Sequence, residues 1–107
     1  MTEQVITIEN RGAVEVVSLN RPERLNAMNE PLIRALLDYF TGLNDRHDVR
    51  VVVLRAEGRA FCAGLDLTGW QRDGETGPVH AGWRTQRMIA AVMQAMRKCP
   101  QPIIACA

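Results

Sequence analysis

The sequence predicts an α/β fold built from ββα units with parallel strand pairing. Two β-type segments separated by a turn come first, and helical and strand-like segments then alternate along the chain. Such an alternation brings successive strands into one sheet and packs the helices against it. The 107 residues, 47% of them hydrophobic and 23% charged, have the size and composition of one ordinary globular domain.

The chain is predicted to begin with a β-hairpin and a loop. Residues 5–9 and 14–19 are rich in β-branched side chains, and Asn10–Gly12 between them supplies turn residues. Two such segments joined by a short turn favour antiparallel pairing. Residues 20–28 contain proline and asparagine and are predicted to form a loop.

Two long amphipathic helices are predicted. The first begins after Asn29, a good N-cap residue, and tolerates Pro31 in its first turn. Its apolar positions recur at helical spacing and are Leu32, Ile33, Leu36, Leu37, Phe40 and Leu43. The second helix follows an exposed connection at Gly74–Pro78 and ends before Pro100 and Pro102. Its apolar positions are Trp83, Met88, Ile89, Val92, Met93 and Met96.

Two further strands, at residues 51–55 and 103–107, are predicted to be buried. Both segments are largely apolar, as is typical of parallel strands that are covered on both faces. The second segment has no turn, polar tail or covering helix after it. We therefore expect residues 1–107 to be the N-terminal part of a larger domain whose remainder is absent from this chain.

The segment Phe61–Leu67, after the strand at 51–55, is the most informative part of the sequence. Gly64 within it lets the backbone bend sharply and approach a ligand closely. Amide N–H groups at the start of a following helix lack intrahelical partners and can point at negative charge. A thioester carbonyl that becomes an enolate or a tetrahedral oxyanion requires fixed donors of this kind. The segment is therefore predicted to provide half of an oxyanion hole.

Three segments resemble the signatures of the crotonase superfamily, also called the enoyl-CoA hydratase/isomerase superfamily. Residues 61–67 have the form Phe-x-Ala-Gly-x-Asp-Leu of its first oxyanion segment. Residues 18–28 are similar to its strand-and-loop signature Asn-Arg-Pro-x-x-x-Asn-Ala, and residues 49–58 resemble the strand that leads to the oxyanion loop. The resemblance covers essentially the whole chain. It implies the N-terminal part of a spiral of ββα turns: hairpin, helix, strand, oxyanion loop, helix and strand.

The resemblance also implies roles for individual residues. In the family, the backbone N–H after the motif glycine donates to the thioester oxygen, which gives this role to Leu65. The positions implied to approach coenzyme A are Arg24, Leu25, Ala27, Ala63, Asp66, Leu67 and Thr68. Many family hydratases have a lysine where this chain has Thr68, which weakens the case for that phosphate contact. Asp66 is favoured as a helix cap over a general base, and a solvated Arg24 is an equal alternative.

Other chemically active side chains favour structural roles. Cys62 precedes a predicted helix N-terminus, which could lower its pKa and make it a nucleophile. However, the two histidines, His47 and His80, lie in polar segments and are predicted at the surface, so a packed thiol is favoured. No metal site is predicted, because ligands at useful spacing are lacking. Trp70 and Trp83 could wall an acyl pocket, although packing is the commoner role of tryptophan.

Charge and cysteine content argue against several classes of protein. A net charge of +1 gives no basis for binding nucleic acid or an anionic membrane surface. No apolar run approaches the ~20 residues of a membrane helix, and the polar N-terminus does not resemble a secretory signal. Cys62, Cys99 and Cys106 have no Cys-x-x-Cys spacing, which indicates a reducing compartment. We expect a cytoplasmic protein.

The resemblance implies an enzyme that hydrates or isomerises an acyl-CoA thioester by stabilising an enolate. It implies no cofactor beyond the coenzyme A of the substrate, and homo-trimers or hexamers of the complete protein. The catalytic glutamates and the second oxyanion segment of the family correspond to positions after Ala107, and neither Glu57 nor Glu75 replaces them. We therefore expect this chain alone to be inactive. Two alternatives stay open: an inert CoA-binding or assembly fragment, and a thioesterase that uses Cys62.

Overall fold

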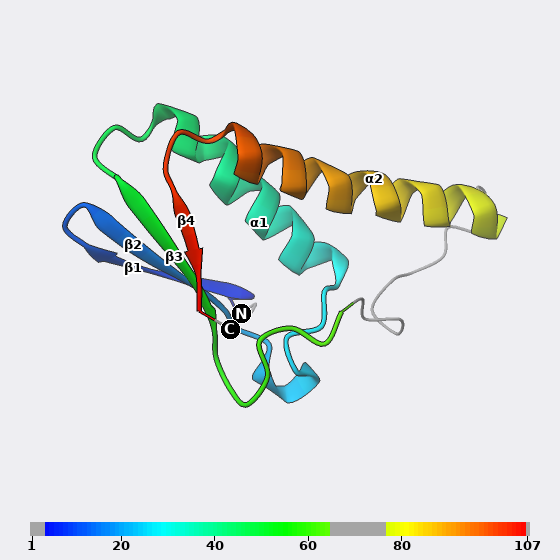
Figure 1. Cartoon of the computed structure of the whole chain (residues 1–107). Coiled ribbons are helices and arrows are strands. Elements are labelled where there is room, and N and C mark those ends of the chain that lie inside the picture. The colour runs from blue at the N-terminus through cyan, green and yellow to red at the C-terminus, as the bar shows by residue number, and fades with distance from the viewer. Residues whose placement is uncertain (1–3, 65–76, 107) are drawn as a thin grey trace.

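The computed structural model describes residues 4–64 and 77–106. It contains a four-stranded sheet of order β1-β2-β3-β4 with two long helices packed against it (Figure 1). The strands are β1 (Ile6–Arg11), β2 (Val14–Leu19), β3 (Val51–Ala56) and β4 (Ile103–Ala105). The helices are α1 (Glu30–Gly42) and α2 (Gly77–Lys98), and η1 (Pro22–Arg24) and η2 (Leu43–Asp45) are short 3₁₀ turns. The predicted α/β order of elements is confirmed.

Strand pairing follows the predicted pattern. β1 and β2 form an antiparallel hairpin in which Ile6 lies opposite Leu19. β2 pairs with β3 in parallel, and β3 pairs with β4 in parallel, with Val52 opposite Ile103. The carboxyl ends of β2, β3 and β4 therefore meet at one edge of the sheet, which we call the carboxyl edge. In α/β sheets this edge is where ligands usually bind.

Both helices lie side by side on one face of the sheet (Figure 1). The core between the two layers is formed by Val17 and Val52 of the central strands and by Leu32 and Phe40 of α1, all completely buried. Burying such a side chain contributes about 1.5–3 kcal/mol relative to exposure. The predicted N-cap of α1 is confirmed, because the Asn29 side chain accepts a hydrogen bond from the Leu32 amide at 3.0 Å.

Two predictions about the second half of the chain are wrong. α2 begins at Gly77, so Gly77 and Pro78 belong to the helix and not to the preceding connection; a proline is tolerated in a first helical turn. The strand predicted at 103–107 ends at Ala105, and Ile104 is 53% exposed, not buried. β4 is an edge strand, and the described residues form no second layer over the sheet face opposite the helices.

The apolar face of α2 is narrower than predicted. Val92 and Ala95 are buried in the core, whereas Trp83 and Met93 are more than half exposed. Both exposed residues lie away from the stripe that faces α1 and the sheet. The guanidinium of Arg87 lies 4.8 Å from the centre of the Trp83 ring, so part of this indole is covered by a cation and not by the core.

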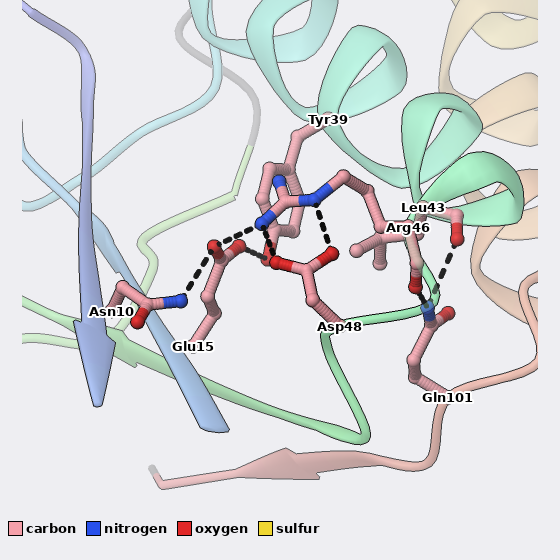
Figure 2. A network of polar contacts seen from close by, with 7 residues as sticks. All are labelled: Asn10, Glu15, Tyr39, Leu43, Arg46, Asp48 and Gln101. Atoms are coloured by element: carbon pink, nitrogen blue, oxygen red, sulfur yellow. Dashed lines mark hydrogen bonds and ion pairs between the residues drawn. The ribbon is translucent and has the colours of Figure 1, made fainter. Parts of the chain in front are cut away.

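A polar network that was not predicted from the sequence lies near the amino ends of β2 and β3, at the edge of the sheet opposite the carboxyl edge (Figure 2). The carboxylate of Glu15, 4% exposed, accepts hydrogen bonds from the Tyr39 hydroxyl at 2.7 Å and from Arg46 Nη2 at 2.8 Å. Asn10 Nδ2 donates to the same carboxylate at 3.3 Å. Burial acts to raise the pKa of Glu15, but the three donors outweigh it and hold this pKa below its ordinary value.

Gln101 adds a second connection at this edge (Figure 2). Its side-chain amide is buried and donates to the backbone carbonyls of Leu43 and Arg46, both at 2.9 Å. These bonds join the segment before β4 to the segment before β3. The starts of the two parallel strands are thus held together by a buried side-chain amide and not only by the sheet.

Candidate active site

The candidate site is formed by two loops at the carboxyl edge. Residues 20–28 follow β2 and residues 57–64 follow β3, so parallel pairing sends both loops to the same place (Figure 1). Two backbone hydrogen bonds join them. The Ala63 amide donates to the Leu25 carbonyl at 3.0 Å, and the Met28 amide donates to the Gly64 carbonyl at 2.7 Å. The segment 18–28 and the described part of the second signature, residues 61–64, are therefore neighbours in space.

The first loop has an unusual backbone. Leu25 and Asn26 are consecutive residues with positive φ, of 53° and 56°. This conformation is uncommon for residues other than glycine, and such outliers concentrate at functional sites. The loop is also closed internally, because Nη1 of Arg21 donates to the Ala27 carbonyl. One of the two left-handed residues, Leu25, and the nearby Met28 provide the backbone groups that meet the second loop.

Asn26 connects the two loops through its side chain. It is completely buried, and its Oδ1 accepts a hydrogen bond from the Arg21 amide at 2.7 Å. Its Nδ2 donates to the carbonyls of Glu57 at 2.7 Å and Ala60 at 2.8 Å. The second loop is therefore tied to the first near its beginning by Asn26, and near its end by the backbone bonds.

Gly58 allows the second loop to lie close to the first. Its φ is +88°, and a Cβ atom there would lie only 2.7 Å from Cβ of Pro22. That distance is far inside van der Waals contact. The glycine is thus required both by backbone conformation and by the proximity of the Asn-Arg-Pro signature.

Replacing Gly58 with alanine is expected to destabilise the fold by about 1–3 kcal/mol, the usual cost of overpacking or of a strained backbone. Urea unfolding followed by circular dichroism measures the effect. Gly42→Ala is the control, because Gly42 has a helical φ of −66° and an added Cβ would meet nothing within 4 Å. Alanine there should leave stability unchanged or raise it. Equal stability of the two variants would contradict the steric argument.

The structure describes residues 61–64 of the predicted oxyanion segment, up to the bend at Gly64. The φ of Gly64 is +100°, and its amide points to Sγ of Cys62 at 3.5 Å. Since the Ala63 amide is bound to Leu25, neither amide is left for a ligand. Several predicted residues lie outside the described part of the chain, and these are Leu65, Asp66, Leu67, Thr68, Trp70 and Glu75.

The described residues bring four of the predicted coenzyme A positions together. Arg24, exposed at the end of η1, precedes Leu25 and Ala27 on the first loop, and Ala63 is hydrogen-bonded to that loop. A cavity of about 300 Å³ lies at the start of the second loop, and none of these four residues lines it. Its lining comprises Arg55, Ala56, Gly58, Arg59, Ala60, Phe61 and Cys106. Ligand pockets usually begin at about this volume.

Other candidate groups do not form a second centre. His47 is exposed and lies in the loop before β3, at the edge opposite Cys62. The side chain of His80 is outside the described set. Across residues 4–64 and 77–106, no group of three metal-ligating side chains lies together. Neither helix in these ranges is long and apolar enough to cross a membrane.

Comparison with known proteins identifies the family. A family model described as enoyl-CoA hydratase/isomerase matches residues 14–107. The chain belongs to the enoyl-CoA hydratase/isomerase family. Among curated relatives of this crotonase-type chain, the probable enoyl-CoA hydratase echA12 of Mycobacterium leprae is 37% identical over 109 residues. The match covers 98% of the chain and 37% of that protein.

Two further comparisons agree with this assignment. The 1,2-epoxyphenylacetyl-CoA isomerase of Escherichia coli K12 is 33% identical over 105 residues, covering 97% of the chain and 39% of that protein. A crystal structure of enoyl-CoA hydratase from Mycobacterium smegmatis matches with a TM-score of 0.87 and 33% identity. The match covers 96% of the chain and 39% of that structure. The crotonase fold is confirmed, and the chain spans well under half the length of these relatives.

Two described residues have structural roles that were not predicted from the sequence. Asn26 was considered only as a member of a signature, and Gly58 only as the end of a strand. The fixed spacing between Asn20-Arg21-Pro22 and the second asparagine was a usable signal. An asparagine that tolerates positive φ and offers two N–H donors suits a position between two loops.

Proposed function

We propose that this chain supplies the first oxyanion donor and part of the coenzyme A-binding surface of an enoyl-CoA hydratase or isomerase. The observation that carries this proposal is the pair of backbone bonds, Ala63 to Leu25 and Met28 to Gly64, at the carboxyl edge. They join the loop assigned to coenzyme A with the loop assigned to the oxyanion. Membership of the family supports the assignment of both loops.

In the proposed mechanism the backbone N–H of Leu65 donates to the thioester carbonyl oxygen. The amides of Ala63 and Gly64 already have protein acceptors. The next amide along the chain is that of Leu65, and we assign it to the ligand. Negative charge grows on the oxygen as the enolate forms, and a fixed donor stabilises it. Loss of one such donor typically lowers the rate about 10²–10³-fold.

Acid–base groups outside this chain move the proton or add water in this proposal. Glu57 is not assigned to that role, because it does not lie at a position that the family resemblance gives to a catalytic glutamate. We assign the acid–base groups to the remainder of the domain, of which residues 1–107 are the N-terminal part in this proposal. The span of the family match, 37–39% of the relatives, supports this division.

The proposed substrate is an acyl-CoA thioester, and no further cofactor is needed. The coenzyme A-binding residues are those at the two loops, namely Arg24, Leu25, Ala27, Ala63, Asp66, Leu67 and Thr68. Arg24 is exposed, as a residue that meets phosphate oxygens must be. The name of the isomerase relative from Escherichia coli also includes a CoA thioester.

We further propose that the complete protein is a cytoplasmic enzyme of fatty acid metabolism that forms homo-trimers or hexamers. The compartment is inferred from the three cysteines, which are all free. The oligomer is inferred from the family resemblance. Sedimentation velocity of the full-length protein tests it, and a stable monomer would contradict it.

Turnover of crotonyl-CoA and of a 3-enoyl-CoA tests the function. We expect activity in the full-length polypeptide that carries these residues, and none in residues 1–107 alone. Activity of the short chain would contradict the assignment of the acid–base groups to other segments. Binding of acyl-CoA without turnover by the full-length protein would instead support an inert binding or assembly role. Thioester cleavage that survives alkylation of Cys62 would exclude the cysteine mechanism.

A further inference from the structure

We propose that Asn26 is a positioning residue whose side-chain amide sets the loop that carries the oxyanion donor. The inference rests on the proposed function for what this loop does, and on contacts between described residues for how it is held. Asn26 touches no reacting atom in this proposal. It acts through the backbone of residues 57–64.

The two N–H groups of the Asn26 amide hold carbonyls on both sides of the bend at Gly58. The acceptors belong to Glu57 and Ala60, at 2.7 and 2.8 Å. They lie more than thirty positions along the chain from Asn26, so the contact fixes tertiary and not local structure. Because the side chain is completely buried, water does not compete for these bonds. Removing the amide leaves the carbonyls of two half-buried residues without their donor.

The neighbours of Asn26 hold the other end of the same loop. The Leu25 carbonyl accepts from Ala63, and the Met28 amide donates to Gly64. Three residues of the segment 25–28, namely Leu25, Asn26 and Met28, therefore contact the beginning of the second loop or the backbone next to Leu65. If Asn26 no longer fixed the beginning, the position of the bend would depend on two backbone bonds alone. An error of about 1 Å in a catalytic group can cost about 10²-fold in rate.

Gln101 provides a matched control within the same chain. Like Asn26, it is a buried side-chain amide that donates to two backbone carbonyls, here at 2.9 Å each. It lies at the opposite edge of the sheet, before β4 (Figure 2). A variant at Gln101 therefore removes a comparable structural clamp without touching the two loops.

The test compares Asn26→Gly and Gln101→Ala in the full-length protein. Glycine keeps the positive φ of 56° accessible, so Asn26→Gly removes the side-chain amide without adding backbone strain. We expect kcat for crotonyl-CoA to fall about 10–10²-fold with KM changed less than about threefold. Gln101→Ala should lower the melting temperature about as much as Asn26→Gly does, but it should change kcat less than about twofold. Asn26→Ser, which retains one donor, should give an intermediate kcat.

A second readout does not need activity. Amide hydrogen exchange at Ala63 and Met28 should accelerate at least tenfold in Asn26→Gly and stay unchanged in Gln101→Ala. If the unaltered protein turns over no enoyl-CoA, the proposed function fails, and exchange alone then decides the role of Asn26. Full kcat in Asn26→Gly, equal losses of kcat in both variants, or unchanged exchange would overturn the proposal. So would failure of both Asn26 variants to fold while Gln101→Ala folds.

Discussion

Replacing Gly64 with alanine is expected to lower kcat for enoyl-CoA turnover by the full-length protein about 100-fold, with KM nearly unchanged. Gly64 has a φ of +100°, which a residue with a Cβ rarely adopts. Space is not the obstacle, because an added Cβ would meet nothing within 4 Å. The alanine backbone is instead expected to relax and turn the next amide, that of Leu65, away from the thioester oxygen. Stopped-flow and steady-state assays with crotonyl-CoA measure the change.

Gly12→Ala is the matched control for this variant. Gly12 also has a positive φ, of +68°, and also lacks neighbours within 4 Å of an added Cβ. It lies in the β1–β2 turn, away from the two loops. Both variants therefore impose backbone strain, which costs about 1–3 kcal/mol, but only Gly64→Ala should impair catalysis. Full activity in Gly64→Ala would contradict a role of the Gly64 bend in the mechanism.

Replacing Glu15 with glutamine is expected to destabilise the fold by about 1.5–3 kcal/mol at neutral pH. That is the usual contribution of hydrogen bonds to a charged group, and here the acceptor is buried with donors from Tyr39, Arg46 and Asn10. Glutamine keeps the size of the side chain but loses the charge and one acceptor oxygen. Equilibrium unfolding in urea gives the difference in stability. Glu9→Gln, which alters an exposed ion pair with Arg11, is the control and should have no measurable effect.

The effect of Glu15→Gln should depend on pH. The pKa of Glu15 is lowered in the folded protein, so its contribution to stability is present above the unfolded pKa of about 4.3. It is lost as pH falls from that value through the lower folded pKa. The free energies of unfolding of the two proteins should therefore converge in acid, below about pH 4. A constant difference between pH 7 and pH 3 would contradict the assigned direction of the shift.

Features set by neighbouring residues were predictable from the sequence. The hairpin was predicted from its turn, and the start of α1 from Asn29, because turns and caps depend on a few adjacent residues. The parallel order of β2, β3 and β4 followed from the alternation of strands and helices. The family assignment rested on short signatures whose order and spacing are visible in the sequence.

Features set by distant contacts were not predictable in the same way. The Asn26 amide meets carbonyls 31 and 34 positions away, and Tyr39 meets Glu15 across 24 positions. Alternation in a strand cannot show that a glutamate such as Glu15 is buried with its donors. The burial of β4 was predicted from apolarity alone, whereas exposure depends on its position at the edge of the sheet.

The bonds from Ala63 to Leu25 and from Met28 to Gly64 join main-chain atoms, and this has an evolutionary consequence. Side chains at Leu25, Met28 and Ala63 can mutate without breaking the attachment, provided that the backbone conformation is kept, whereas Gly64 is constrained by its positive φ. Under the proposed function, selection can therefore alter how such a protein discriminates among acyl groups while the geometry of the donor assigned to Leu65 is inherited. A scaffold of this kind allows a lineage to diversify its chemistry by changing what surrounds the reactive carbonyl.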